Sequence, residues 1–417
     1  MELRRSWVES ANRPGAPFPL NNLPYGVFST VQAQPRLGVA IGEAVLDVAA
    51  VSHTLDLPGD ADLLRDPRGW NGVMEAGQAV WAALRQRLAE VLSEGATERA
   101  TVEPHLVPLS DATLHMPFTV AEFTDFYSGK HHAANVGTMF RGPENALPPN
   151  WLHMPMGYNG RASSVVVSGT EIRRPWGQVK RPEDSEPHFA PSARFDFEME
   201  LGAVVGQPSA GPLSVDRADA SIFGFVLLND WSARDIQAWE YQPLGPFQAK
   251  ATATSISPWI VTTAALAPFR CSTPARDLPL LPHLRDTGPM NYTIDLTATL
   301  TPAGGSAETI ARTNARELYF SAAQQLAHHS SCGCPMRVGD LLGSGTISGP
   351  MREARGSLLE LSWGGEDPVH LSNGQSRAFI EDGDTITLGG HATRDAVTIG
   401  FGECTGCVLP ALDDPYQ

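Results

Sequence analysis

The sequence has little of what membrane proteins and secreted disulfide-rich proteins need. None of its apolar runs approaches about 18 residues, so we expect no membrane-spanning helix. The opening stretch MELRRSWVESANRPG lacks the apolar core of a signal peptide. The chain has only 5 cysteines, an odd and sparse set that argues against a disulfide framework and suits a cytoplasmic location.

Basic residues are also in short supply. The chain has 30 Lys and Arg against 46 Asp and Glu, a net charge of -16 that would repel phosphate backbones. We therefore expect no nucleic-acid partner. The motifs CGC (Cys332, Cys334) and CTGC (Cys404, Cys407) together imitate a four-thiolate zinc site, but the first spacing is wrong for one. Free thiols are the preferred interpretation.

The 417 residues, 42% hydrophobic with 39 Gly and 34 Pro, indicate two turn-rich and strand-rich domains. Three short strands are expected within residues 20–50, and apolar residues at three- and four-residue spacing predict a helix over 72–94 that ends at Gly95. From 118 onward, we expect only two helices, at 232–241 and about 313–329. The expected strands there are 162–169, 195–206, 221–230, 258–263, 290–301, 358–363, 384–390 and 396–402. The fold class is α+β, strand-dominated.

The most informative strand is RFDFEMELGAVVG, from Arg194. Its acidic residues Asp196, Glu198 and Glu200 alternate with apolar ones, so Glu198 and Glu200 would lie about 7 Å apart on one face. This is either a half-exposed polar face or a pair of ligands for a hard divalent cation, which relieves the repulsion between them.

Two further carboxylates are candidates for the same site. Asp230 ends the strand FGFVLLND and would ordinarily cap the following helix. Ser232 and Asp235 fit a capping box, however, which would free Asp230 to face the end of the sheet. Asp125, in the polar stretch EFTDFYSGKHHAANVG, is the fourth.

Candidate proton acceptors and donors lie close to these acids in sequence. His131 and His132 would face opposite ways on extended chain, so one of them could share the pocket of Asp125 and act as a general base on water. Arg234, Gln237 and Tyr241 share one helix face, which is either solvated or aimed at a developing oxyanion. Lys250 and Thr254 follow a PLGP turn and could point back to this site. The glycine-rich DLLGSGTISG around Thr346 lacks the GKS or GKT ending of a phosphate-binding loop.

Taken in order, DFYSGKHHAANVGTMFRG, GYNGRASSVVVSGT, RFDFEMELG, NDWSARDIQAWEYQPLGPF and GDLLGSGTISG resemble the fumarylacetoacetate hydrolase family over nearly the whole chain. The resemblance implies a small SH3-like domain over residues 1–117, a β-roll domain over 118–417, and a homodimer. It also implies hydrolysis of the diketo acid 4-fumarylacetoacetate to fumarate and acetoacetate, the last step of tyrosine and phenylalanine catabolism, with Mg²⁺ or Ca²⁺ as cofactor.

The resemblance assigns roles residue by residue. The base is His132, oriented by Glu360, and the oxyanion is stabilised by Arg234, Gln237 and Lys250. The metal residues are Asp125, Glu198, Glu200, Asp230, Lys250 and Thr254, and the substrate contacts are Tyr127, Arg141, Tyr158, Gln237, Tyr241 and Thr346. Lys130-His131 and the CTGC motif depart from the family pattern, and the first departure leaves His131 as a rival base.

Two alternatives stay open. The chain could be a hydrolase or decarboxylase of another acylpyruvate or oxo-acid, because one fold supports several reactions. It could also be a non-catalytic metal-binding relative, although the presence of both His132 and Glu360 argues against that interpretation.

Overall fold

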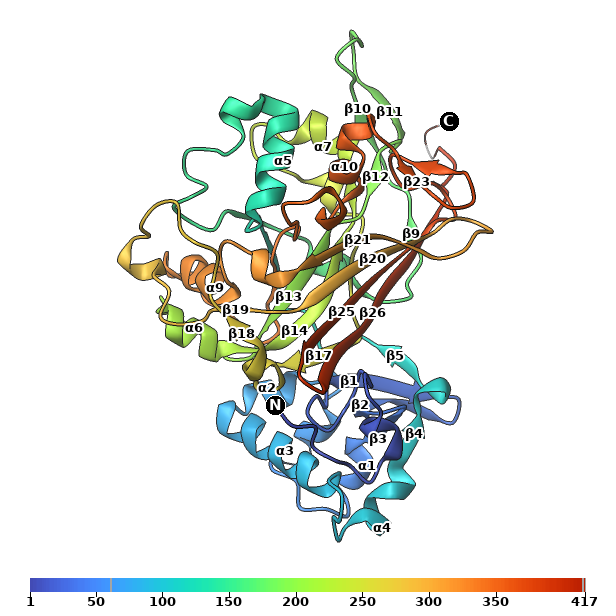
Figure 1. Cartoon of the computed structure of the whole chain (residues 1–417), viewed down its shortest axis with the longest axis vertical. Coiled ribbons are helices and arrows are strands. Elements are labelled where there is room, and N and C mark those ends of the chain that lie inside the picture. The colour runs from blue at the N-terminus through green and yellow to red at the C-terminus, as the bar shows by residue number, and fades with distance from the viewer. Residues whose placement is uncertain (61, 415, 417) are drawn as a thin grey trace.

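A mixed sheet of 13 strands runs through most of the molecule in the computed structural model, which describes residues 1–60, 62–414 and 416 (Figure 1). The main path has the order β4-β3-β2-β1-β17-β14-β13-β22-β6-β7, and β5, β16 and β8 pair beside it. The bounds along that path are β4 Leu106–Pro108, β3 Ala44–Asp47, β2 Ala33–Ile41, β1 Tyr25–Thr30, β17 Trp259–Thr262, β14 Ile222–Asp230, β13 Met199–Val205, β22 Leu341–Gly343, β6 Phe123–Phe126 and β7 Gly157–Asn159. The pairs β22–β6 and β16–β8 are parallel and the others antiparallel, so the sheet is mixed. The predicted strand-dominated fold is confirmed.

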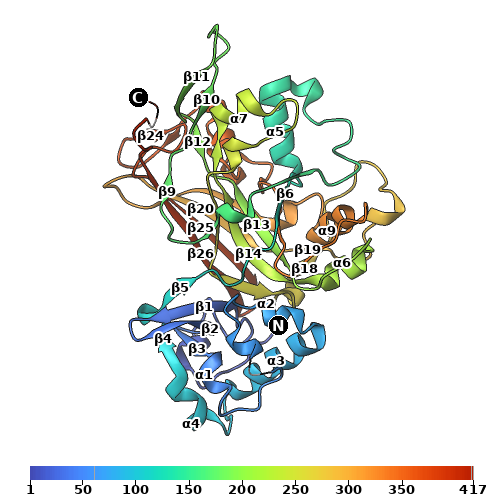
Figure 2. The ribbon, with the colours of Figure 1, turned by 180° about the vertical axis from the view of Figure 1, so that it is seen from behind.

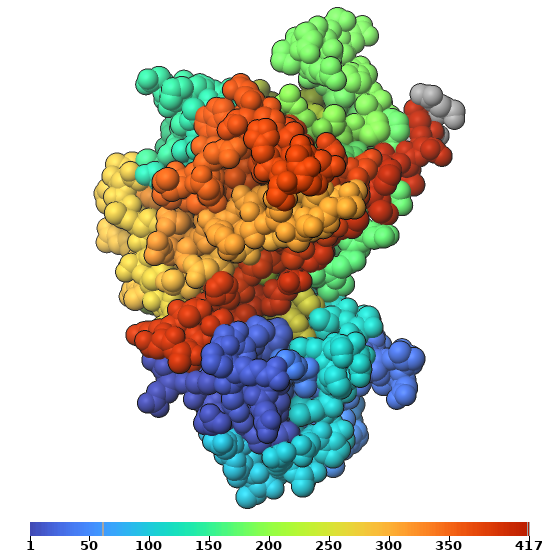
Figure 3. All heavy atoms as spheres, turned by 45° about the vertical axis from the view of Figure 1, so that its right-hand side comes forward, coloured from blue at the N-terminus to red at the C-terminus, as the bar shows by residue number. Residues whose placement is uncertain are grey.

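A five-stranded sheet packs against the central part of the large one. Its order is β21-β20-β25-β26-β9, with bounds β21 Glu308–Asn314, β20 Asp295–Thr301, β25 Thr385–Arg394, β26 Val397–Leu409 and β9 Ile172–Arg173. The largest hydrophobic core fills the space between the sheets. The two sheets pack closely at Gly390 of β25, where an added Cβ would come within 2.6 Å of Leu227 on β14. In Figure 3, the C-terminal segment (red) runs diagonally across the visible face of the molecule, between the N-terminal part (blue) and the orange segment of the larger part.

The N-terminal part combines the first strands with short helices and lies at one end of the molecule (Figure 2). Its remaining elements are β5 Thr113–His115, α1 Val48–Val51, α2 Asn71–Glu75, α3 Gln78–Val91 and α4 Arg99–Val102. The helix predicted over 72–94 is in fact two, because Gly77 adopts a φ of 88° between α2 and α3, and α3 ends at Val91 rather than at Gly95.

The hydrophobic core of the N-terminal part continues into the larger part. Tyr25 of β1 pairs with Ile260 of β17, and its ring stacks on Trp70 and tilts against Phe223 of β14. Val204, Val226, Leu228 and Leu341 belong to the same core cluster. A division at residues 117 and 118 therefore separates chain segments that share a core, and this division stays a prediction.

Two elements that position functional residues differ from the prediction. Residues Lys130–Arg141 form helix α5 where we expected irregular chain, and Leu358–Leu361 form helix α10 where we expected a strand. The strand prediction failed because Ser357 accepts a hydrogen bond from the backbone N–H of Glu360 and caps a helix there. The other helices are α6 Val215–Ser221, α7 Arg234–Glu240, α8 Thr263–Leu266 and α9 Ala322–Ser330.

The shorter strands complete the architecture. They are β8 Val165–Val167, β10 Trp176–Val179, β11 His188–Pro191, β12 Phe195–Asp196, β15 Ser232–Ala233, β16 Thr254–Ile256, β18 Arg270–Cys271, β19 Asn291–Tyr292, β23 Val369–His370 and β24 Ser376–Arg377. The prediction of one helix over 313–329 was only partly correct, since β21 continues to Asn314 and α9 starts at Ala322. Within the described residues, every helix is too short or too polar to cross a bilayer.

Candidate active site

Four carboxylates meet at one edge of the large sheet. Asp125 lies on β6, Glu200 on β13 and Asp230 at the end of β14, while Glu198 directly precedes β13. The strands are neighbours in the order β14-β13-β22-β6, so side chains that are distant in sequence lie close together in space. One oxygen from each carboxylate lies within 4.8 Å of those from the other three, and all four side chains are buried. The half-exposed polar face considered for this strand is therefore excluded.

This acidic cluster has the chemistry of a hard-cation site. Asp125 Oδ1 and Glu200 Oε1 are buried and have no hydrogen-bond partner among the described residues. Burial, and then the neighbouring carboxylates, raise the pKa of both groups, which is a cost that a divalent cation would remove. Gly343 makes room here, since a Cβ on it would lie 2.5 Å from Asp125 Oδ1. Oxygen-only ligands fit Mg²⁺ or Ca²⁺.

Two basic side chains border the acidic cluster. Lys250 Nζ donates to Glu198 Oε2 and to Asp230 Oδ2, both at 2.6 Å. Arg234 Nη1 lies 2.5 Å from Glu198 Oε1. Burial alone would raise the pKa of Glu198, but Arg234 and Lys250 hold it below its usual value. A protonated amine has no lone pair to offer a metal ion. Lys250 is therefore better suited to donate hydrogen bonds beside the ion than to coordinate it directly.

The hydroxyls near Asp230 complete this side of the site. Thr254 Oγ1 donates to Asp230 Oδ1 at 3.3 Å, and Tyr158 donates to Asp230 Oδ2 at 3.0 Å. The capping box expected from Ser232 and Asp235 is wrong. Ser232 donates to the carbonyl of Asp230, and Asp235 accepts from Ser192 and the N–H of Ala193. Asp230 nevertheless points into the site, as one of the four carboxylates of the cluster.

A buried histidine–carboxylate pair lies beside the cluster. His132 on α5 and Glu360 on α10 are joined by a hydrogen bond of 2.6 Å between Nδ1 and Oε2. The pKa of Glu360, which burial alone would raise, is lowered by His132 and by the hydrogen bonds to the carboxylate. His131 is on the same helix but contacts Glu317 at 3.6 Å and does not line the cavity.

Sequence reasoning missed the residues that hold Glu360 in place. Asn135 donates to Oε1 at 2.8 Å, and Ser348 and Ser357 each donate to Oε2 at 2.9 Å. Two signals were available in the sequence. Asn135 lies three residues after His132, on the same face of a helix, and Ser357 stands three residues before Glu360, the spacing of a helix cap.

A cavity of about 540 Å³ opens between α5, α7 and the edge of the sheet. The ribbon views agree that α5 and α7 lie side by side here (Figures 1 and 2). All six predicted substrate contacts line the cavity, together with Asp125, His132, Glu198, Arg234 and Lys250; these contacts are Tyr127, Arg141, Tyr158, Gln237, Tyr241 and Thr346. Glu200, Asp230, Thr254 and Glu360 lie behind this lining.

Apolar side chains also line this cavity, which the sequence did not indicate. They include Val136, Phe140, Met156, Ala238, Leu244 and Pro246. Arg141 already donates to the carbonyls of Asn145 and Ala146, at 3.1 Å and 2.9 Å, so only part of its guanidinium is free for a ligand. Thr346 has a buried hydroxyl without a partner among the described residues.

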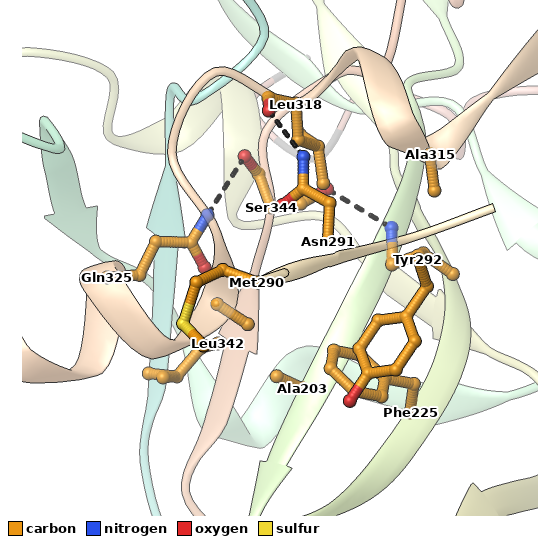
Figure 4. A pocket seen from close by; sticks show the side chains of 12 residues that line it. Ala203, Phe225, Met290, Asn291, Tyr292, Ala315, Leu318, Gln325, Leu342 and Ser344 are labelled. Carbon is orange, nitrogen blue, oxygen red and sulfur yellow. Dashed lines mark hydrogen bonds between the residues drawn. The ribbon is translucent and has the colours of Figure 1, made fainter. Parts of the chain in front are cut away.

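A second cavity is too small for a substrate. It encloses about 20 Å³ between Phe225, Tyr292, Leu318 and Leu342, behind the active-site strands. Figure 4 shows Gln325 and Ser344 on one side of it, where the Gln325 amide also donates to Ser128 at 2.9 Å. The 540 Å³ cavity is therefore the candidate active site. The five cysteines are free, and the carboxylates form the only His, Cys, Asp and Glu cluster suited to a metal within the described chain.

A carboxylate cluster suited to a hard cation, an oriented histidine and buried cationic donors around one cavity together define the active site of an enzyme that uses a metal ion and acid–base catalysis. The comparisons identify the family. The family model for the fumarylacetoacetate hydrolase C-terminal region matches residues 122–409, and the one for the fumarylacetoacetase N-terminal region matches residues 21–117. This chain belongs to the fumarylacetoacetate hydrolase family.

Individual relatives agree with this membership. Fumarylacetoacetase of Bos taurus is 50% identical over 407 residues, covering 95% of this chain and 97% of the relative. Fumarylacetoacetase of Homo sapiens is 48% identical with the same coverage. The solved structure of a fumarylacetoacetate hydrolase from psychrophilic Exiguobacterium antarcticum matches at a TM-score of 0.53 and 16% identity, covering 93% of this chain and 99% of that one, and supports the fold alone.

Proposed function

We propose that this hydrolase cleaves a carbon–carbon bond of 4-fumarylacetoacetate with water, which yields fumarate and acetoacetate. Relatives that are 50% and 48% identical over 95% of the chain carry the name fumarylacetoacetase. The observation that carries the proposal is the buried His132–Glu360 pair, at 2.6 Å, beside the carboxylate cluster in the same cavity. The reaction would be the last step of tyrosine and phenylalanine breakdown.

His132 is the proposed general base. Glu360 Oε2 accepts a hydrogen bond from Nδ1–H of His132 at 2.6 Å, which leaves Nε2 free to remove a proton from water. The resulting imidazolium is stabilised by the same carboxylate, whose position is fixed by Asn135, Ser348 and Ser357.

Arg234, Gln237 and Lys250 are the proposed oxyanion donors. When water adds to the carbonyl beside the fumaroyl group, negative charge develops on that oxygen, and fixed donors in a buried site stabilise it. Arg234 Nη2 is buried and has no partner among the described residues, so this N–H group is available to a ligand. Gln237 Oε1 accepts from Arg234 Nη1 at 3.2 Å, which directs its amide NH₂ elsewhere.

The four carboxylates Asp125, Glu198, Glu200 and Asp230 are the proposed holders of Mg²⁺ or Ca²⁺. When bound, the ion supplies Lewis-acid stabilisation for the oxygens of the diketone and of the departing enolate. Thr254 orients Asp230 through its hydroxyl, and Lys250 balances the charge of Glu198 and Asp230.

The rest of the cavity is proposed to hold the substrate. The free part of the Arg141 guanidinium suits a carboxylate end of the diketo acid, and Tyr127, Tyr158, Tyr241 and Thr346 supply hydroxyls. The apolar lining residues Val136, Phe140 and Met156 would pack against the carbon chain.

The deciding experiment is turnover of 4-fumarylacetoacetate by the metal-replete protein, followed as loss of the diketone absorbance with identification of both products. We expect fumarate and acetoacetate in equal amounts and loss of activity with a chelator. Cleavage or decarboxylation of simpler acylpyruvates or oxo-acids, without turnover of this substrate, would favour the other enzymes of this fold. An inert protein that still binds the ion would indicate a non-catalytic relative.

Three further proposals rest on the family resemblance. We propose a homodimer, a cytoplasmic location, and domains over residues 1–117 and 118–417. Sedimentation analysis tests the first, fractionation of cells the second, and limited proteolysis between residues 117 and 122, where the two family matches meet, the third.

A further inference from the structure

Asp196 is the one carboxylate of the acidic motif that the proposed mechanism does not use. It lies on β12 and its side chain is fully buried. Oδ2 accepts from Arg234 Nε at 2.9 Å and from the N–H of Leu359 at 3.0 Å. Oδ1 accepts from the N–H groups of Leu358 at 2.8 Å and Phe197 at 2.9 Å. All four partners are donors, which is an environment that suits an acceptor-only carboxylate.

These partners belong to two separate elements of the active site, which we call the α10 arm, with Glu360, and the Arg234 arm, at the start of α7. Leu358 and Leu359 begin α10, and the next residue is Glu360, which holds His132. Arg234 begins α7 and carries the proposed oxyanion donor. Asp196 is thus the group that both arms contact, although 162 residues of chain separate it from Leu358.

The contact with Asp196 fixes how the guanidinium points. Arg234 Nε is held by Asp196, and Nη1 is held by Glu198 at 2.5 Å and by Gln237 at 3.2 Å. Because the guanidinium is planar, bonds on both sides leave it one orientation. Nη2 remains the unpartnered nitrogen of this residue, which lines the cavity.

We propose that Asp196 is a positioning residue, which sets the guanidinium of Arg234 and the helix that carries Glu360 relative to each other. The inference rests on the proposed function for its kinetic test. Asp196 is fully buried and does not line the cavity. Its contribution is the geometry of Arg234 and Glu360.

The kinetic test is a double-mutant cycle on 4-fumarylacetoacetate. Asp196→Asn places an NH₂ group against donors, and we expect kcat to fall about 10- to 100-fold with KM changed less than about threefold. In combination with Arg234→Gln, the total loss should be smaller than the product of the single losses by at least about fivefold. Losses that simply multiply would overturn the proposal for the Arg234 arm.

The second test needs no turnover. The His132–Glu360 hydrogen bond, at 2.6 Å, should give a strongly downfield proton resonance that is identified by its loss in Glu360→Gln. Asp196→Asn should shift or broaden this resonance, and an unchanged resonance would overturn the proposal for the α10 arm. If the wild-type protein does not turn over the substrate, the proposed function fails, while this test still decides the role of Asp196.

The chain offers a matched control in Asp384. It is also fully buried and binds one arginine with both oxygens, at 2.8 Å and 3.1 Å from Arg377. Asp384→Asn should lower the thermal unfolding midpoint but leave kcat and the downfield resonance unchanged, and equal effects of both variants would overturn the proposal. If Asp196→Asn does not fold, Asp196→Ser, which leaves space for water, replaces it with the same expected outcomes.

Discussion

At the scale of single residues, the two neighbouring histidines differ in burial and in the carboxylate that each contacts. The side chain of His132 is 4% exposed and bonded to Glu360, whereas that of His131 is 38% exposed and 3.6 Å from Glu317. His132→Ala should therefore lower kcat by about 10²- to 10⁴-fold, the usual contribution of a general base. His131→Ala is the control and should retain activity. Steady-state kinetics check both, and the reverse pattern would make His131 the base.

Asp340 is a buried acid that should make stability depend on pH. Its Oδ2 accepts from the N–H of Arg337, but Oδ1 has no partner among the described residues, and burial raises its pKa from 3.8 to about 6. The carboxyl of Asp340 therefore binds its proton more tightly in the folded state than in the unfolded state. The stability that the protonated group contributes at low pH is lost as pH rises from about 4 to about 6.

Removing that charge should stabilise the protein at neutral pH. Asp340→Asn keeps an acceptor for Arg337, and we expect a gain on the order of 1–3 kcal/mol in the free energy of unfolding at pH 8. The gain should disappear below about pH 4, where wild-type Asp340 is protonated in both states. Denaturant unfolding at several pH values checks this, and a difference that is independent of pH would contradict it.

At the scale of elements, Asp125 on β6 and Glu200 on β13 approach each other across β22, which lies between these strands and carries Gly343 there. A Cβ on Gly343 would lie 2.5 Å from Asp125 Oδ1 and 3.0 Å from Glu200 Oε2. Gly343→Ala should push these ligands apart and weaken Mg²⁺ binding at least about tenfold. Calorimetric titration measures the affinity directly.

The stabilising effect of the ion gives a second measurement. An ion that binds only the folded state raises the unfolding midpoint, and for the wild type we expect about 2.7 kcal/mol at an ion concentration 100 times the Kd. Gly343→Ala should show a smaller shift at the same concentration. Gly211→Ala, where an added Cβ meets nothing within 4 Å, is the matched control and should behave as wild type. An unchanged affinity in Gly343→Ala would contradict the prediction.

The elements also show how far the sequence could predict the site. The alternation in RFDFEMELG correctly indicated Glu198 and Glu200 on one face, because a period of two follows from strand geometry alone. Helices α5 and α10 were missed, since glycine and polar residues weaken the periodicity of the first, and four residues are too few to show any in the second.

The network around Glu360 could be predicted only in part. The spacings of Asn135 from His132 and of Ser357 from Glu360 are visible in the sequence, but no local pattern indicates that α5 and Ser348 come to lie beside Glu360 in the folded chain. Asp196 was visible as part of the acidic motif, but its bond to Arg234 depends on the pairing of β12 with β15.

At the scale of the whole molecule, the two parts of the chain share one sheet and one core cluster, so they should unfold together. Phe223 of β14 lies at their junction, with its ring 5.0 Å from Trp81 and 5.7 Å from Tyr25. Phe223→Ala should cost about 3–5 kcal/mol, the usual result of emptying a buried aromatic site.

The effect of Phe223→Ala should reach both parts at once. Amide hydrogen exchange should accelerate together in β1–β3 and in β13–β14, because opening either side exposes the core of the other. Phe189→Ala, at an exposed position on β11, is the control and should change neither. A single calorimetric transition is expected for the wild type. Two transitions, with faster exchange confined to the N-terminal strands in Phe223→Ala, would show instead that residues 1–117 fold independently despite the shared core.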